Sequence, residues 1–206
     1  MDTITKLSKI FSEFPGIGPR QAKRFVYFLL SRHDGHINEL IELLADLKKQ
    51  IRVCNECYRF FSDSQKTHST CDICRQNNRN HHELMIVSRD VDLENIEKSH
   101  SYMGLYFVLG GNVPILDKNP EDKIRLRELL TKIERQSAEG LNEIIFGLNA
   151  NPEGEYTEEY LRKILAPLTQ KNNIKLSILG RGLSTGTELE YSDSDTIKNA
   201  LLNRHS

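Results

Sequence analysis

The sequence has no long apolar run and no secretory leader. Its longest apolar stretches, such as Phe25–Leu30, fall far short of the roughly 20 residues that a transmembrane helix needs. Met1 is followed by Asp2 and an amphipathic segment, without the basic and apolar regions of a secretory signal. We therefore expect a cytoplasmic protein that is not bound to a membrane. Internal repeats and low-complexity tracts are also missing.

Net charge is nearly absent too, because 28 lysines and arginines face 29 aspartates and glutamates. The molecule as a whole offers no strong attraction to phosphate, so any nucleic-acid surface has to be a local patch. Residues 1–32 carry a local charge of +4, from six basic side chains against two acidic ones. The basic ones are Lys6, Lys9, Arg20, Lys23, Arg24 and Arg32. The N-terminal region is therefore the predicted basic module.

Apolar residues recur at three- and four-residue steps over Ile4–Phe14, Arg20–Ser31 and Ile37–Ile51, which predicts three helices separated by Pro15-Gly16 and by His33-Asp34-Gly35. From Leu84 onward, short apolar runs alternate with helical patterns, which predicts a parallel-rich α/β sheet. The expected strands are Leu84–Val87, Leu105–Leu109, Ile144–Leu148 and Leu176–Leu179. The expected helices are Leu93–Lys98, Glu121–Arg135, started by Asn119-Pro120, and Thr157–Gln170.

The four cysteines form the pairs Cys54-x-x-Cys57 and, thirteen residues later, Cys71-x-x-Cys74. Disulfides are rare in a reducing cytosol, which leaves metal ligation, buried free thiols or a redox pair. Two such pairs can hold one ion from opposite sides, and four thiolates suit tetrahedral Zn²⁺ without leaving a position for substrate. We predict one structural zinc ion per chain. Three nearby histidines are interpreted as surface side chains: His68, His81 and His82.

The segment Phe14-Pro15-Gly16-Ile17-Gly18-Pro19-Arg20 lies between the first two expected helices. Its glycines allow a tight turn and leave backbone N–H groups uncovered at a helix start, where a phosphate oxygen can bind. Arg20, Lys23 and Arg24 add attraction to phosphates that is independent of base sequence. The pattern is typical of a DNA-binding helix-hairpin-helix motif; the alternative is a plain helical turn with solvated charges.

The segment Asn149-Ala150-Asn151-Pro152-Glu153-Gly154-Glu155 follows an expected strand, where α/β proteins place binding groups. It resembles the Asp-x-Asp-x-Glu-Gly-Glu segment of Toprim domains, whose paired aspartates bind Mg²⁺. Here both aspartate positions hold asparagine, and the glutamate that ends the first Toprim strand is replaced by Ser88. Amides bind divalent cations weakly compared with carboxylates, so we expect a Toprim fold used for binding, with no catalytic residues.

An acidic cluster lies near the end of the chain, and it is interpreted as a solvated face or partner surface rather than a metal site. It consists of Glu188, Glu190, Asp193 and Asp195. Alternation would place Glu188 and Glu190 on one face of a strand if the segment is extended, and Asp193 or Ser194 is expected to cap a final helix.

Along the chain, the helix-hairpin-helix motif, the four cysteines, the altered Toprim segment and the segment 182–191 follow one another in an order that resembles the RecR family from end to end. The resemblance extends to Gly104-Leu105-Tyr106-Phe107-Val108-Leu109-Gly110-Gly111, Cys71-Asp72-Ile73-Cys74-Arg75 and Gly182-Leu183-Ser184-Thr185-Gly186-Thr187-Glu188-Leu189-Glu190-Tyr191. We expect an α+β and α/β chain of four modules. They are a helix-hairpin-helix module (1–52), a four-cysteine zinc finger (53–79), a Toprim domain (80–175) and a C-terminal strand and helix region (176–206). The long cysteine spacing, and Phe107 in place of a common histidine, depart from the family pattern without removing a ligand.

The resemblance implies a non-catalytic DNA-binding protein of recombinational repair. It implies a homotetrameric ring whose Arg20 and Arg24 face DNA, with Lys23 beside them, so that four +4 modules converge on one channel. Its partners would be RecO, bound in part through Glu153 and Glu155, and in many bacteria RecF. The complex would help RecA assemble on gapped DNA coated with single-strand-binding protein.

Two other functions compete with this one. The first is a Mg²⁺-dependent Toprim nuclease, primase or topoisomerase, against which the missing carboxylates at Ser88, Asn149 and Asn151 count. The second is a zinc-stabilised adaptor that binds proteins and ignores DNA, for which the nearly neutral charge is the best argument.

Overall fold

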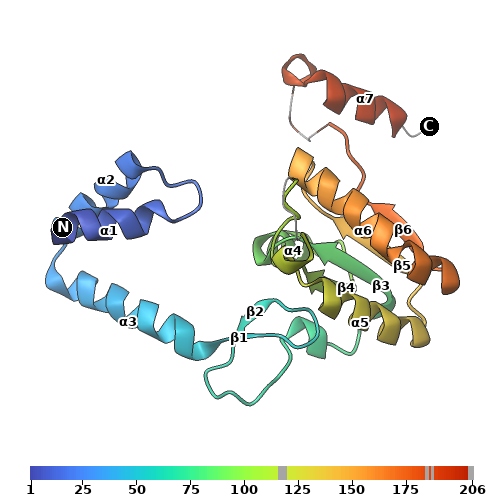
Figure 1. Ribbon diagram of the computed structural model, residues 1–206, viewed down its shortest axis with the longest axis horizontal. Helices are drawn as coiled ribbons and strands as arrows, with labels where there is room; N and C mark the ends of the chain where they lie inside the picture. Colours follow the sequence, from blue (N-terminus) through green and yellow to red (C-terminus); the bar gives the residue numbers. More distant parts are fainter. Residues whose placement is uncertain (116–119, 184–185, 187, 204–206) are drawn as a thin grey trace. The chain divides into compact units, whose positions relative to one another are not determined.

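The computed structural model describes residues 1–115, 120–183, 186 and 188–203. The chain divides into two compact units. The N-terminal unit comprises Met1–Ile51 and Ser62–Lys66, and the C-terminal unit comprises Arg52–Phe61 and Thr67–Ser206. Figure 1 follows the chain through both. Asn119, Ser184, Thr185 and Thr187, which belong to expected motifs, lie outside the described residues.

Three helices make up most of the N-terminal unit: α1 (Thr3–Ser12), α2 (Pro19–Leu30) and α3 (Asp34–Gln50). Between α1 and α2 the chain turns at Gly16, whose φ of +77° lies in the region that favours glycine. Pro19 supplies the fixed φ of a first helical residue. The two helices pack through the rings of Phe11 and Phe25, which meet edge to face with centroids 5.9 Å apart.

Helix α3 begins at Asp34, so the prediction that His33-Asp34-Gly35 separates two helices is wrong for Asp34 and Gly35. His33 is the N-cap, because its Nδ1 accepts a hydrogen bond from His36 N at 3.2 Å. No residue of α3 is buried. Four of its apolar side chains are 58–62% exposed: Ile41, Leu43, Leu44 and Leu47.

The C-terminal unit is built on four strands: β3 (Asn80–Val87), β4 (Gly104–Val108), β5 (Glu143–Gly147) and β6 (Lys175–Ile178). Their order is β4-β3-β5-β6, and all three pairings are parallel. Three helices connect them: α4 (Asp90–Lys98), α5 (Leu126–Ala138) and α6 (Pro152–Lys171). Figure 1 shows these helices beside the sheet. The predicted parallel sheet is therefore present, with each expected strand in place.

Each face of the sheet contributes to its own apolar cluster, because neighbouring strand residues point to opposite sides. Leu84 and Ile86 pack with apolar residues of α5 and α6. Met85 and Val87 pack in a second cluster with Leu93 of α4. That second cluster also contains Cys54, Cys57, Phe61, Cys71 and Ile73. The cysteine segment and α4 thus cover one face of the sheet, and α5 and α6 cover the other.

The remaining elements are short. Strands β1 (Ile51–Val53) and β2 (Phe60–Ser62) form a two-stranded sheet, and 3-10 helices occupy Ile73–Arg75, Pro120–Lys123 and Leu189–Tyr191. The last helix is α7 (Ser194–Leu202), and Asp193 caps it as predicted, since its Oδ1 accepts from Thr196 N at 2.8 Å. None of the described helices is long and apolar enough to cross a membrane.

Two expected helix starts and one expected strand are corrected. Helix α5 begins at Leu126 instead of Glu121, because Pro120–Lys123 forms a separate 3-10 turn. Helix α6 begins at Pro152, five residues before Thr157. The segment around Glu188 and Glu190 is not a strand, because Leu189–Tyr191 is a 3-10 turn.

Candidate functional site

Four cysteine side chains come together at the start of the C-terminal unit. Cys54 and Cys57 follow β1, Cys71 precedes the 3-10 turn Ile73–Arg75, and Cys74 lies within it. Their sulfur atoms all lie within 4.8 Å of one another, and the Cys57 and Cys71 sulfurs are 3.6 Å apart. Sulfurs about 2.3 Å from a tetrahedral ion would be roughly 3.8 Å from each other. The cluster therefore has the size of a metal site with four thiolate ligands.

The surroundings of Cys54 favour its thiolate form. The backbone N–H groups of Glu56 and Cys71 donate to Cys54 Sγ at 3.4 and 3.3 Å. The neighbouring thiols, Cys57 first and Cys71 second, lower the pKa of Cys54. Tyr58, with φ of +62°, closes the turn by donating its N–H to Cys54 O at 2.9 Å. Two backbone donors to one sulfur stabilise its thiolate, which is the form of cysteine that binds a metal ion.

The histidines near the cysteines are surface side chains, as the sequence predicted. His68, His81 and His82 are exposed. His82 Nδ1 donates to Gly140 O at 2.7 Å, just past the C-cap of α5. Among the described residues, the four cysteines form the only cluster of three or more metal-binding side chains.

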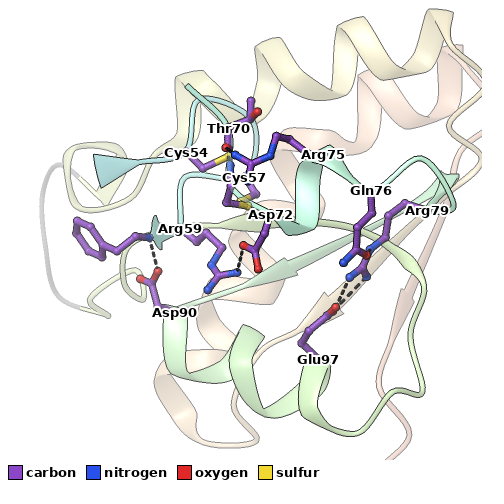
Figure 2. Close-up of polar contacts among 12 residues, drawn as sticks. Cys54, Cys57, Arg59, Thr70, Asp72, Arg75, Gln76, Arg79, Asp90 and Glu97 are labelled. Atoms are coloured by element: carbon purple, nitrogen blue, oxygen red, sulfur yellow. Dashed lines mark hydrogen bonds and ion pairs between the residues drawn. The ribbon is translucent and has the colours of Figure 1, made fainter. Parts of the chain in front are cut away.

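Helix α4 contacts the segment that carries the cysteines, residues 53–79, at two points (Figure 2), and we call this segment the cysteine finger. At the start of α4, Asp90 Oδ1 accepts from Phe60 N of β2 at 2.6 Å. Near its end, Glu97 accepts both arms of the Arg79 guanidinium, whose Nε also donates to Gln76 Oε1 at 2.8 Å. The Arg79 side chain is only 2% exposed. A buried, charge-assisted fork of this kind fixes geometry as well as adding energy.

Helix α5 fastens the finger from another side. Glu56, between the first two cysteines, pairs with Lys132 Nζ at 3.3 Å and with the Arg135 guanidinium. The backbone is held as well, because Cys57 O accepts from Val108 N at 2.8 Å. Apart from residues 62–66, which belong to the N-terminal unit, the finger therefore packs into the core of the C-terminal unit.

The predicted DNA contacts share one face of α2. Arg20, Lys23 and Arg24 are exposed and lie three and four residues apart, which brings them side by side on a helix. Ala22 and Val26 turn to the interior and fix the rotation of α2. Arg24 Nη1 donates to Gln21 Oε1 at 3.2 Å, and within the described residues none of the three cations has an acidic partner. Their charges are therefore available to a ligand.

The segment predicted as a loop after β5 is mostly the start of α6. Asn151 is the N-cap, because its Oδ1 accepts from Gly154 N at 2.8 Å. Glu153 and Glu155 lie in the first turn and are exposed. Glu155 Oε1 accepts from Arg181 Nη1 at 2.6 Å, so one of the two predicted partner contacts is already in an ion pair.

The positions of the missing Toprim carboxylates lie at neighbouring strand ends. Val87 of β3 pairs with Gly147 of β5, so Ser88 and Asn149 follow adjacent strands. Ser88 is buried, and its hydroxyl donates to Asn112 Oδ1. Asn149 is exposed, and no cluster of carboxylates forms at this edge among the described residues.

A family model of the Toprim domain matches residues 82–180, and one described as "RecR, C-terminal" matches residues 182–205. The recombination protein RecR of Bifidobacterium animalis subsp. lactis (strain AD011) is 35% identical over 98% of this chain and 94% of its own length. The RecR protein of Prochlorococcus marinus (strain MIT 9515) is 34% identical over 99% of this chain and 98% of its length. That of Herpetosiphon aurantiacus is 35% identical over 98% and 96%. The chain belongs to the RecR family.

Membership in the RecR family gives the chain a role in DNA recombination and repair. The Toprim match spans β3 to β6, which confirms the predicted Toprim fold, and the RecR C-terminal match covers α7. The four-cysteine cluster is a metal-binding feature within this RecR chain.

The residues that hold the finger against α4 and α5 were not predicted from the sequence. Arg79, Glu97 and Asp90 belong to no motif, and Glu56 meets Lys132 across 76 positions of sequence. One signal was available: Lys132 interrupts the apolar stripe of α5 formed by Leu129 and Ile133, and it is 5% exposed. A lysine in such a stripe indicates a buried partner.

Proposed function

We propose that this chain is a non-catalytic DNA-binding protein that works with RecO, and with RecF where it occurs. Together they promote RecA loading onto gapped DNA or DNA coated with single-strand-binding protein. The observation that carries the proposal is the face of α2 on which Arg20, Lys23 and Arg24 are exposed without acidic partners among the described residues. Three such cations on one face provide sequence-independent attraction to the phosphates of one DNA backbone.

In this proposal, α1, α2 and the turn at Gly16 form a helix-hairpin-helix motif, within a DNA-binding module of residues 1–52. The finger would span 53–79, the Toprim domain 80–175 and the C-terminal region 176–206. Ideal Cβ atoms on Gly16 and Gly18 would meet nothing within 4 Å, so the backbone of the turn is open to a phosphate. We further propose a homotetrameric ring in the cytoplasm.

Zinc is the ion we assign to the four cysteines, at one ion per chain. Four sulfur donors suit Zn²⁺, and a complete set of thiolates leaves no position for substrate. The ion would therefore be structural. Its ligands would be Cys54, Cys57, Cys71 and Cys74.

The absence of catalysis is part of the proposal. Toprim chemistry needs carboxylates that hold Mg²⁺, and Ser88, Asn149 and Asn151 offer only a hydroxyl and two amides. Glu153 and Glu155 remain, and we assign them to RecO binding. The first turn of α6 presents both to solvent.

The test is DNA binding across a salt series, with and without RecO, comparing wild type with the Arg20→Ala, Arg24→Ala double variant. Each lost phosphate contact should lower the salt slope by about one, so the variant should lose roughly two units and bind more weakly. Lys98→Ala, Lys171→Ala removes the same charge from exposed positions outside the DNA-binding module and serves as the control. Equal binding by wild type and the α2 variant would favour a protein adaptor that ignores DNA.

A separate assay addresses the Toprim enzyme alternative. Purified protein with Mg²⁺ and DNA should show neither cleavage nor primer synthesis. Activity that persists through purification and disappears in Glu153→Gln would replace the proposal with an enzyme.

A further inference from the structure

A buried threonine joins the loop after β4 to the acidic first turn of α6. Thr157, in the second turn of α6, has no exposed surface. Its hydroxyl accepts a hydrogen bond from Val113 N at 2.9 Å and donates one to Glu153 O at 2.7 Å. One side chain thus contacts a loop more than 40 positions away and the backbone of a proposed partner-binding residue.

Only a hydroxyl can make both contacts at this place. A valine has the same shape but neither accepts nor donates, so it would leave the N–H of Val113 unpaired. Val113 is fully buried, and no water can replace the lost partner without opening the packing. The structure can recover a partner for this N–H only by moving the loop or the start of α6.

The loop is itself fixed from the finger side. Val108 N donates to Cys57 O at 2.8 Å, directly beside the metal-binding sulfurs. Two positions further, Gly110 N donates to Ser88 O at 3.0 Å, and the Ser88 hydroxyl donates to Asn112. Hydrogen bonds therefore connect Cys57 of the finger, through the loop 109–113, to Thr157.

We propose that Thr157 is a positioning residue: its hydroxyl sets the first turn of α6, and thereby Glu153 and Glu155, against a loop that is held by the finger. The inference rests on the proposed function, in which these glutamates bind RecO. It adds the residue that orients them and a physical link from the finger to the partner surface. Thr157 itself is buried and touches no partner.

The experiment compares Thr157→Val with Thr157→Ser in the full-length protein, with RecO binding and backbone amide exchange as readouts. The valine variant should bind RecO about tenfold more weakly, which corresponds to one buried unsatisfied N–H. The serine variant keeps the hydroxyl and should bind within about twofold of wild type. Thr169→Val is the matched control, because Thr169 is a buried threonine of the same helix whose hydroxyl bonds only carbonyls of α6.

Amide exchange reads the same hydrogen bond without RecO. In Thr157→Val, exchange should quicken at Val113 and over residues 153–158, and in Thr157→Ser it should not. If wild type binds RecO but Thr157→Val binds equally well, the positioning role is overturned while the partner surface stands. If wild type does not bind RecO, the partner assignment fails on its own, and exchange decides: faster exchange in the valine variant alone supports positioning, and unchanged exchange overturns it.

Ser88→Ala provides a second test if Thr157→Val does not fold. It releases Asn112 and loosens the loop without touching α6. Quicker exchange at Val113 together with weaker RecO binding, by roughly twofold to fivefold, supports the link. A loosened loop with unchanged exchange in α6 overturns it.

Discussion

At the scale of single residues, the cysteines are both the proposed metal ligands and part of the core. Cys54, Cys57 and Cys71 have no exposed surface and share an apolar cluster with Met85 and Val87 of the sheet. Thiolates this close repel one another unless a cation lies between them. In the proposed zinc protein, metal binding therefore stabilises the same residues that pack one face of the sheet.

Replacing Cys57 with serine should remove the ion and destabilise the whole C-terminal unit. Metal analysis should fall from one zinc per chain to none, and the midpoint of thermal unfolding should drop by on the order of 5 °C or more. Chelation of the wild type should act in the same direction. His82→Ala, which alters an exposed histidine near the finger, should keep its zinc. Full stability without metal would contradict the shared core.

Glu143 makes the sheet edge sensitive to acid. Its carboxylate accepts from Ser177 Oγ at 2.6 Å and pairs with Lys175 Nζ at 3.0 Å, and these contacts, Ser177 first, lower the pKa of Glu143 from 4.5. Because the folded-state pKa lies below the unfolded value, the stabilisation is complete above pH 4.5 and is lost as the pH falls below it.

The free-energy difference between wild type and Glu143→Gln should therefore be largest near pH 7 and shrink toward about pH 3. Urea unfolding at a series of pH values measures it. Glu134→Gln, at an exposed position of α5, provides the comparison and should show a smaller and flatter difference. If the difference in unfolding free energy between wild type and Glu143→Gln grew as the pH fell, the stabilising role of the Glu143 carboxylate would be refuted.

At the scale of elements, the start of α6 depends on a glycine. A Cβ on Gly154 would lie 2.0 Å from Asn149 O, closer than any real contact. Gly154→Ala should therefore displace the first turn and cost about 1–3 kcal/mol of unfolding free energy. Gly180→Ala is the control, because its Cβ would meet nothing within 4 Å. Denaturant midpoints of the two variants check the prediction, which equal stabilities would disprove.

Periodicity predicted the elements better than it predicted their ends. All four strands of the sheet follow from apolar runs, because buried parallel strands are apolar on both faces. The start of α6 was missed because the polar segment Asn151–Glu155 has no apolar stripe, although Asn151 followed by Pro152 is a capping signal. The β1-β2 pairing was missed because each strand has only three residues.

The candidate sites also contain some residues that the sequence predicts and others that it does not. Ligands close in sequence, such as Cys54 and Cys57, follow from spacing, whereas Arg79 with Glu97 and Val113 with Thr157 depend on how distant elements pack. Toprim resemblance indicated Glu153 and Glu155 but not that Arg181 already pairs with one of them.

At the scale of the whole molecule, α3 has an apolar face that the described residues of its own unit leave exposed. Leu44 and Leu47 are 59% and 58% exposed, and contiguous apolar surface of this kind is typical of association. In the proposed homotetramer we expect this face to contact another copy.

Leu44→Glu, Leu47→Glu should therefore lower the assembly state while leaving each chain folded. Light scattering after size exclusion measures the mass, and far-UV circular dichroism checks the fold. Asn38→Glu places the same side chain at an exposed polar position of α3 and should leave the mass unchanged. A leucine variant that remains tetrameric would exclude this face as the contact.

The shared core also limits how the protein can be cut and recombined. Because the finger covers Met85 and Val87, deleting residues 53–79 would expose apolar side chains of β3 and β4 to solvent. A protein shortened in this way should aggregate during expression and should not be a functional truncated form. For the same reason, the finger should not fold when it is grafted onto another protein, because the residues of β3, β4 and α4 on which it packs would be missing there.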